Sequence, residues 1–346
     1  SSLQSTGHAY AFHFLGAKDQ MELAQGAGQK FWDGDWTLQF LFRPSKNNAL
    51  GRLATVLGHC AVLAKNDTLY MNDVAMPLPY ANNYNYVMLK HEKKAYSLGF
   101  AQTESPANWV VTVKEDDMAA WMQKNMDVDG TEGLFFGKVG DRLNSFKGFL
   151  DEVRVWKKAL TATEIKNTYN RYLTGNEKNL AAYYTFDSGV AEFAFDNSHP
   201  GGIWNKRDSK LPNVGYPELI NDLIPNDSIL CYRGVTDDNG EYQIAGIPFV
   251  GEGTNYMVTP IYGTHQFQPA STRRYVSSQS LAHNDVDFAD KSSFRVPVKA
   301  TYIYGNIPAA GLTVMVDGVS LFDKDNNPIV TDENGEAVAS VPIGKH

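Results

Sequence analysis

The sequence predicts an all-β protein, in which one large sandwich precedes smaller β-modules. Apolar residues alternate with a period of two in many short segments, as expected for half-buried strands. One of these, WTLQFLFRP at residues 36–44, places four apolar side chains on one face and ends at a proline. A sixteen-residue motif also occurs twice, at residues 236–251 and 331–346, which indicates a duplicated β-unit.

Composition narrows the class of protein. A chain of 346 residues predicts two or three domains, and 43% hydrophobic residues are enough for packed cores. The net charge of −8 argues against nucleic acid as a partner. No apolar run approaches the ~18 residues that a membrane-spanning helix needs, so no membrane insertion is expected. Two distant cysteines, Cys60 and Cys231, exclude a disulfide framework.

Residues 1–199 are predicted to form one all-β domain that contains a single short helix. Thr161 and Glu164 have the spacing of a capping box, in which each residue bonds the backbone of the other. A stripe of apolar residues follows at helical spacing, formed by Ile165, Tyr169 and Tyr172. The segment NWVVTVKEDD at residues 108–117 is read as a strand that ends in an acidic turn.

The duplicated motif defines the remainder of the chain. Its two copies lie 95 residues apart, which is the size of one Ig-like domain. Each contains Asn-Gly before alternating apolar residues, so we expect hairpins with type I′ turns. The predicted order is a linker at 200–227, an Ig-like module at 228–290 and a second, incomplete Ig-like module at 291–346. The second module is expected to be truncated because the strands that follow the first copy have no counterpart.

Residues 1–199 resemble a known family. The segment GFLDEVRVWKKALTATEI, residues 148–165, is similar to the laminin-G-like group of concanavalin-type jelly rolls. HAYAFHFLGAKDQMEL, WDGDWTLQFLFRP and LAAYYTFDSG agree with it, so the resemblance covers about 190 residues. It implies a jelly-roll sandwich of the lectin and glucanase type. The sequence departs from the family at Leu15, where aspartate is frequent.

The tail resembles carboxypeptidase-regulatory-like or transthyretin-like Ig modules. The segments that carry this resemblance are TDDNGEYQI, GIP, YMVTP, HQFQP and NDVDFAD, followed by VDG and TDENGE. In that family such modules are mostly non-catalytic spacers and stalks of secreted bacterial proteins. The resemblance therefore implies a large bacterial protein located outside the cell or on its surface.

Asp151 is the candidate metal ligand. By alternation it shares a face with Phe149, Val153 and Val155, where an unpaired carboxylate would be costly. Two explanations are open: backbone amides satisfy Asp151, or a cation does. The laminin-G resemblance implies calcium near this residue, and Asp19, close to the first strand, could contribute a second ligand.

Other charged residues in this region predict no chemistry. Glu152 and Arg154 are expected to share the opposite face and to form an ion pair of little energetic value. Glycosidases on this fold place acids on one strand as Glu-x-Asp-x-x-Glu, and the sequence contains no such pattern. We therefore predict that the chain is not an enzyme.

The predicted ligand-binding residues are aromatic. The segment PLPYANNYNYV, residues 77–87, combines Tyr80, Tyr84 and Tyr86 with three asparagines. Rings can stack on sugars and amides can bond hydroxyls, although tyrosines of a sandwich also commonly belong to its core. Further possible platforms are Trp109, Trp121 and Trp204.

Three functions are compatible with these observations. The first is a non-catalytic extracellular fragment, whose jelly roll binds a glycan or an extracellular protein while the small modules act as spacers. The second is a structural repeat of an adhesin or stalk without a ligand. The third is a set of accessory domains of a carbohydrate-active enzyme, with the catalytic domain elsewhere.

Overall fold

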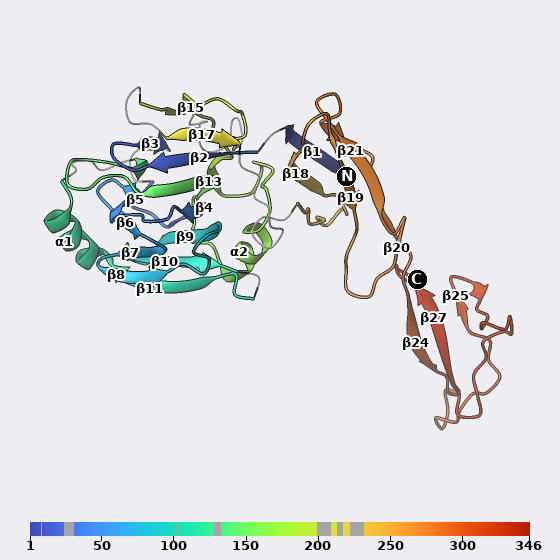
Figure 1. Ribbon diagram of the computed structural model, residues 1–346. Helices are drawn as coiled ribbons and strands as arrows, with labels where there is room; N and C mark the ends of the chain where they lie inside the picture. Colours follow the sequence, from blue (N-terminus) through green and yellow to red (C-terminus); the bar gives the residue numbers. More distant parts are fainter. Residues whose placement is uncertain are drawn as a thin grey trace. The chain divides into compact units, whose positions relative to one another are not determined.

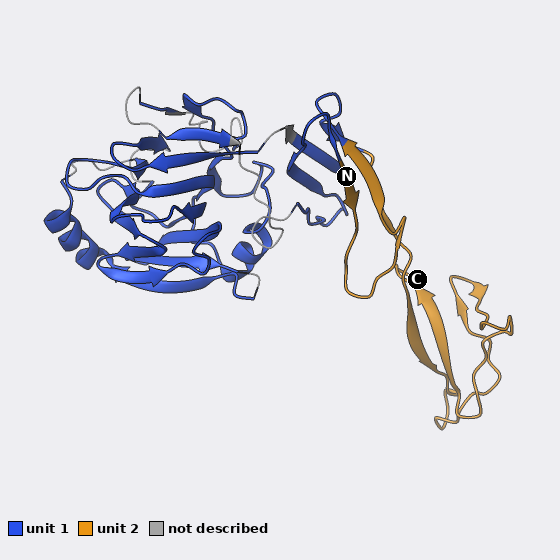
Figure 2. Ribbon diagram, viewed as in Figure 1, with its two compact units in different colours: residues 1–254, 276–284 blue, residues 255–275, 285–346 orange. Residues whose placement is uncertain are grey.

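The computed structural model describes residues 1–7, 9–23, 31–102, 104–127, 133–198, 209–212, 217–221 and 232–346. Strands dominate the described chain, which confirms the all-β prediction (Figure 1). Two compact units are distinguished in Figure 2: residues 1–254 with 276–284, and residues 255–275 with 285–346. Among the described residues, no helix combines the length and the hydropathy that crossing a bilayer requires.

The first unit contains a large sheet of eight strands. Its order is β11-β10-β9-β4-β13-β2-β17, and β14 also pairs with β13. Figure 1 shows β2, β13, β4, β9, β10 and β11 side by side. The strand bounds are β2 Tyr10–Leu15, β4 Trp36–Pro44, β9 Asn85–Glu92, β10 Ala95–Ala101, β11 Asn108–Lys114, β13 Lys147–Trp156, β14 Leu180–Tyr184 and β17 Glu218–Asn221.

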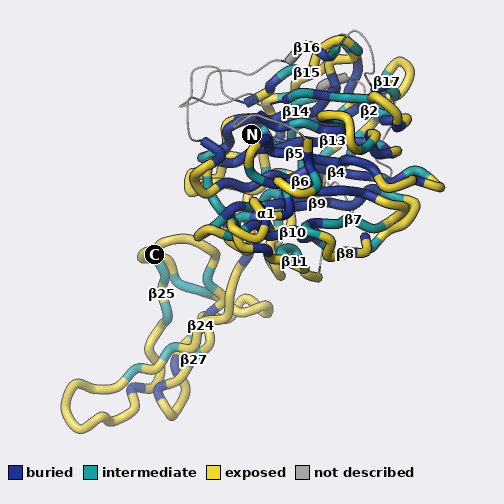
Figure 3. Tube along the Cα trace, turned by 90° about the vertical axis from the view of Figure 1, so that its left-hand side faces the viewer, coloured by how far each residue is buried: buried dark blue, intermediate teal, exposed yellow. Residues whose placement is uncertain are grey.

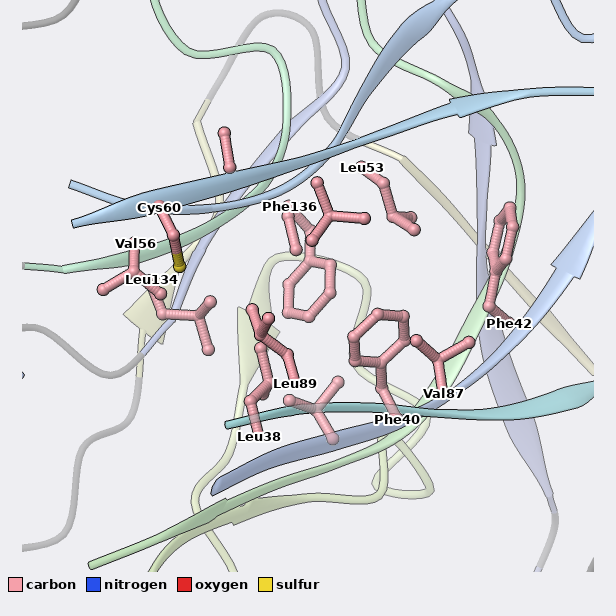
Figure 4. Close-up of a cluster of buried hydrophobic side chains, with 14 of the residues drawn as sticks. Leu38, Phe40, Phe42, Leu53, Val56, Cys60, Val87, Leu89, Leu134 and Phe136 are labelled. Atoms are coloured by element: carbon pink, nitrogen blue, oxygen red, sulfur yellow. The ribbon is translucent and has the colours of Figure 1, made fainter. Parts of the chain in front are cut away.

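A six-stranded sheet completes the sandwich, in the order β3-β12-β5-β6-β7-β8. Its strands are β3 Gln20–Leu23, β5 Gly51–Val56, β6 Cys60–Lys65, β7 Thr68–Met71, β8 Val74–Pro77 and β12 Leu134–Gly137. The main core lies between the two sheets, where Phe40 and Phe136 meet edge to face with centroids 5.1 Å apart (Figure 4). Cys60 belongs to this core, and burial raises the pKa of its thiol.

Two helices accompany the sheets. Helix α2, Ala162–Thr168, begins at the predicted capping box: Thr161 accepts from the Glu164 amide, and Glu164 accepts from the Thr161 amide. Its apolar stripe packs into a second buried cluster, which includes Leu41, Tyr86 and Trp156 of the large sheet. Helix α1, Glu115–Asn125, occupies the place of the predicted acidic turn. The acidic residues occupy its first turn, where their negative charge interacts favourably with the positive end of the helix dipole.

A β-bulge divides the residues of β13 between the two faces of the sheet. The register against β4 shifts between Asp151 and Arg154, and Glu152 has a φ of 50°. Phe149 therefore packs with the second cluster, whereas Val153 and Val155 belong to the main core. The prediction that these residues share one face was wrong, because the extra residue reverses the alternation beyond Asp151.

A small sheet in the same unit joins distant parts of the sequence. β1, Ser2–Gly7, runs parallel to β18, Gln243–Pro248, and antiparallel to β22, Ala282–His283. The first strand of the chain thus pairs with strands of the predicted 228–290 module. β17 lies within the predicted linker, yet it forms the edge of the large sheet. The predicted domain boundaries stay a prediction.

The remaining strands form two-stranded ribbons. In the second unit β24, Ser293–Lys299, pairs along its length with β27, Glu336–Pro342. Figure 3 shows that these two strands are mostly exposed or half-buried, whereas β4 and β13 are mostly buried. The shorter pairs are β15 Phe193–Ala194 with β16 Ser209–Lys210, β19 Thr254–Val258 with β21 Thr272–Val276, β20 Phe267–Gln268 with β23 Ala289–Asp290, and β25 Met315–Val316 with β26 Val319–Ser320.

The two copies of the duplicated motif form the same turn. The Gly240 amide donates to the Asp237 carbonyl at 2.9 Å, and Gly335 donates to Asp332 at the same distance. In each turn the aspartate side chain accepts from the amides two and four residues later. The glycine has positive φ but the preceding asparagine does not, so these are not the predicted type I′ turns. Because the aspartate side chain holds each turn through these hydrogen bonds, the turn needs only one residue with positive φ, the glycine.

Gly246 allows β18 to approach the segment after α2, and this contact can be tested. It has a φ of 72°, and a Cβ there would lie 2.1 Å from Cγ of Tyr172. Gly240, with a φ of 77°, would place its Cβ in open space. We expect Gly246→Ala to lower the free energy of unfolding by about 1–3 kcal/mol more than Gly240→Ala, because steric overlap adds to backbone strain. Denaturant titration of both variants measures this difference, and equal losses would contradict the contact.

Candidate functional site

Four side chains form a stacked row across the outer face of the large sheet. The register places His13 of β2 opposite Phe149 of β13, and Phe149 opposite Arg43 of β4. These positions alternate with those of the core residues Phe12, Leu150 and Phe42, so they lie on the other face. Tyr84, directly before β9, is the fourth member.

The members of the stacked row contact one another through their flat faces. The His13 and Phe149 rings are 4.1 Å apart with an interplanar angle of 4°. The guanidinium carbon of Arg43 lies 3.9 Å from the centroid of Phe149 and 5.2 Å from that of Tyr84. Neighbouring members of the row therefore cover one another's faces.

Charge is distributed unevenly along this surface. Nδ1 of His13 lies 3.6 Å from the Glu218 carboxylate of the edge strand. Burial lowers the pKa of His13, although Glu218 opposes that shift. Asp19 accepts a hydrogen bond from the Leu15 amide at 2.7 Å, and burial raises its pKa. The β17 end is therefore acidic, whereas Arg43 carries positive charge nearer the centre of the sheet.

The three predicted tyrosines occupy different environments. Tyr80 has 40% of its surface exposed, whereas Tyr84 and Tyr86 retain 1% and 3%. Tyr86 accepts a hydrogen bond from Arg154 at 2.8 Å, and burial raises its pKa to about 12. Of the three, only Tyr80 has an exposed side chain, while Tyr84 belongs to the stacked row. A joint role in ligand binding stays a prediction.

Buried Asn85 organises the loop that carries Tyr80. Its side chain accepts from the Tyr80 amide at 2.9 Å and donates to the Tyr80 carbonyl at 2.8 Å. The Tyr80 hydroxyl accepts from Gln102 of the segment after β10 at 3.3 Å. Tyr84 follows in the same loop, and its amide donates to the Asn83 side chain at 2.8 Å. The exposed ring of Tyr80 is therefore held close in sequence to one end of the stacked row.

Sequence reasoning did not identify His13, Phe149 and Arg43 as a group. They come from three strands that are far apart in the chain, and they meet only because the strands pair in one register. Alternation predicts an outward position for His13 and Arg43, but it groups Phe149 with Val153 and Val155, because the bulge of β13 is not visible in the sequence. The pairing order β2-β13-β4 was not foreseeable either, because one sequence does not reveal which strands are neighbours.

The two predicted metal ligands do not converge. Asp19 bonds the Leu15 amide, and Leu15 pairs with Lys147, four positions before Asp151 on β13. Four residues of a strand span roughly 13 Å. Asp151 is 1% exposed and accepts from the Glu152 amide at 2.7 Å, as expected for a structural aspartate. In the part of the chain that the structure describes, no three His, Cys, Asp or Glu side chains are grouped to hold a metal ion. Calcium binding stays a prediction.

The two predicted tryptophan platforms that the structure describes offer little exposed ring surface. Trp109 of β11 is half-buried, and the Lys90 amine lies 4.7 Å from its centroid. Trp121 of α1 is buried in the main core. Trp204 lies outside the described residues.

A buried ion pair lies beneath α2 on the outer face of the large sheet. Nη2 of Arg154 is 3.0 Å from Oε2 of Glu152, and neither side chain is exposed. The expected ion pair is present, but the segment after α2 covers both groups, so the pair is buried; its small energetic value stays a prediction. Arg154 also donates to the carbonyls of Thr168 and Arg171, and Tyr183 donates to Glu152 at 2.6 Å. These bonds fasten the segment after α2 to the bulge of β13.

A further carboxyl group, Asp187, lies near this pair. It accepts from the Tyr10 amide at 2.8 Å, and it is 7% exposed. Burial raises its pKa well above the usual value, and the negative charge of Glu152 adds to this shift. Asp187 is therefore held predominantly in its neutral form over a wider range of pH than an exposed aspartate.

Comparison with known proteins gives only distant similarities. No known protein family and no curated protein matches the sequence. Among solved structures, a candidate carbohydrate-binding protein from Bacteroides ovatus is similar over 62% of this chain and 60% of its own, with 16% identity and a TM-score of 0.41.

Two further structures are more distant. The CBM40 module of a Ruminococcus gnavus sialidase, bound to sialyllactose, matches over 44% of this chain and 96% of its own (15% identity, TM-score 0.28). A Trypanosoma rangeli sialidase mutant with trans-sialidase activity matches over 40% and 23% (11% identity, TM-score 0.29). The chain thus spans less than two thirds of the first and the last of these proteins. At such scores the similarities decide neither fold nor function.

The energetic role of the buried ion pair can be tested. We expect Glu152→Gln to lower the free energy of unfolding by about 3–5 kcal/mol, because the Arg154 charge would remain buried without its partner. Glu336→Gln breaks the Lys299–Glu336 pair, whose side chains are 54–66% exposed, and should cost at most about 1 kcal/mol. Denaturant titrations measure both losses. A loss below 1 kcal/mol for Glu152→Gln would show that the pair does not hold this region together.

The raised pKa of Asp187 predicts a dependence of stability on pH. A carboxyl whose pKa is higher in the folded state binds its proton more tightly there, so its stabilising contribution is complete below the ordinary pKa and decreases as pH rises towards the folded pKa. Asp187→Asn removes this titration. Relative to the wild type, the variant should therefore be more stable at pH 7 than at pH 4. Denaturant titrations at both pH values test this, and a pH-independent difference would contradict it.

Proposed function

We propose that the large sandwich is a non-catalytic glycan-binding module, which binds its ligand at Tyr80 and along the stacked row of His13, Phe149, Arg43 and Tyr84. The observation that carries this proposal is the continuity of the two features: one loop holds the exposed ring of Tyr80 and then supplies Tyr84 to the row. A sugar needs both an apolar face to stack on and polar groups for its hydroxyls.

The described residues supply both kinds of contact. Tyr80 offers a ring whose position is fixed by Asn85 and Gln102, so little conformational entropy is lost when a ligand stacks on it. Asn82 is exposed in the same loop and offers an amide. Arg43 contributes positive charge to the surface, and Glu218 contributes acceptors at its other end. The strands beneath are paired, so the surface is largely pre-formed.

The proposal treats the site as one that binds and does not react. A retaining or inverting glycosidase needs two carboxyl groups about 5–10 Å apart on either side of the scissile bond. Glu152, on the strand that carries Phe149, is buried and bonded to Arg154 and Tyr183. Glu218 and Asp19 lie at the edge-strand side, where Glu218 pairs with His13 and Asp19 holds the Leu15 amide.

We further propose that the chain acts outside the cell or on a bacterial surface, with the smaller modules as spacers. The resemblance of the tail to such spacers supports this location. The small sheet packs against the sandwich, because a Cβ at Gly246 of β18 would lie 2.1 Å from Cγ of Tyr172. Such a contact would fasten β18 of the first spacer to the binding module.

A glycan array tests the proposed function directly. We expect the full chain to bind one class of glycan, and Tyr80→Ala to weaken that binding at least tenfold, because the stacking platform is lost. Tyr262→Ala is the matched control, since Tyr262 is 67% exposed in the second unit. Each array is run with calcium and with a chelator, which also tests the calcium prediction.

Two results would contradict the proposal. Absence of binding to any glycan would favour the architectural alternative, in which the chain is a stalk without a ligand. Equal binding by Tyr80→Ala and the wild type would place the binding site elsewhere on the molecule.

A further inference from the structure

We propose that His13 makes glycan binding at this surface dependent on pH, because protonated His13 competes with the sugar hydroxyls for the Glu218 carboxylate. This inference rests on the proposed function, since it names a regulation of the same site. Its basis is the position of the His13 ring, which lies between the face of Phe149 and the carboxylate of Glu218.

The fold packs the His13 ring in place and leaves the Glu218 carboxylate accessible. The rings of His13 and Phe149 are 4.1 Å apart with an interplanar angle of 4°. The register of β2 against β17 sets Glu218 opposite His13, and Oε2 lies 3.6 Å from Nδ1. The histidine side chain is 22% exposed and the glutamate side chain 59% exposed. A ligand can therefore reach the carboxylate from solvent.

Charged groups from each neighbouring element act on His13. Glu218 of β17 and Asp19, in the turn after β2, favour its protonated form, whereas Arg43 of β4 opposes it. Lys147 of β13 adds a further cation on the same face. Burial has the largest effect, so the pKa of His13 lies below its ordinary value. At neutral pH the ring is therefore predominantly uncharged.

The charge of His13 decides how much of Glu218 is available to a sugar. A contact of 3.6 Å is longer than a hydrogen bond, so beside a neutral ring the carboxylate keeps its capacity to accept hydrogen bonds from hydroxyls. An imidazolium at this distance adds a Coulomb attraction that a neutral hydroxyl lacks. Acid therefore engages Glu218 within the protein and weakens its contact with the glycan.

The same coupling acts in the opposite direction. Among the neighbouring charges, Glu218 contributes most to raising the pKa of His13. A sugar that occupies the carboxylate weakens this contribution, so the pKa of His13 should fall further in the complex. Binding at acidic pH should accordingly release a proton.

Calorimetry of the full chain at pH 7 and at pH 5 tests the proposal. The probes are neutral oligosaccharides of glucose, galactose and mannose, which carry no group that titrates between these values. We expect the affinity to fall at least about threefold at pH 5, because only the fraction with neutral His13 binds well. Titrations in buffers of different ionisation enthalpy should show the release of a proton at pH 5.

Three variants assign the effect to His13 and Glu218. His13→Gln removes the titrating ring and should bind with nearly the same affinity at both pH values. Glu218→Gln removes the carboxylate, so it should bind more weakly than the wild type at pH 7 and lose the pH dependence. His346→Gln changes a histidine of the second unit and should keep the dependence of the wild type. Circular dichroism melting curves show whether each variant remains folded.

Nuclear magnetic resonance of the imidazole provides a readout that a merely structural role would not change. The signal of His13 is identified by its absence in His13→Gln, and its pKa is measured by titration. Glu218→Gln should lower this pKa, and a saturating oligosaccharide should lower it as well. A pKa that responds to neither change would contradict the competition.

The failures of the two proposals are distinguishable. Equal affinity of the wild type at pH 7 and pH 5 would overturn this inference and leave the proposed function standing. A dependence on pH that survives in His13→Gln would also overturn it, because another group would then be the one that titrates. No binding of any probe at either pH would overturn both the inference and the proposed function.

Discussion

The buried pair of Glu152 and Arg154 at the β13 bulge is the interaction on which the outer face of the large sheet depends. The bulge inserts one residue and turns Arg154 away from the main core, towards the segment that follows α2. There the guanidinium satisfies backbone carbonyls that would otherwise be buried without donors. Part of this face is thereby covered and anchored. Phe149, before the bulge, packs against the second cluster while only partly buried, and it forms the row with His13 and Arg43.

The same bulge explains why one strand has both a structural and a proposed binding role. Val153 and Val155 pack in the main core, and Arg154 binds the segment after α2 that covers this face. Phe149 stacks between His13 and Arg43. A strand without the bulge would bring Phe149 and Val155 to the same face. The positive φ of Glu152 is a strained conformation for this residue, and the bonds from Arg154 and Tyr183 maintain it.

Local features were predictable from the sequence, whereas features that depend on pairing were not. The capping box of Thr161 and Glu164 uses neighbouring residues, and the structure contains it. The alternation in β4 correctly indicated a strand. The environments of Tyr84 and Arg154 depend on which strands are adjacent and on what covers them, and a single sequence does not encode this in its local pattern. The turns after Asp237 and Asp332 form through side-chain bonds, which the Asn-Gly signal does not reveal.

Amide hydrogen exchange with and without a bound glycan tests the central claim most directly, because it reports where a ligand protects the chain without prior choice of a residue. The account predicts that protection increases in three segments that are distant in sequence: the Tyr80 loop, the end of β4 around Arg43, and the start of β13 around Phe149. Protection confined to the six-stranded sheet or to the second unit would contradict the assignment of the binding surface to the outer face of the large sheet.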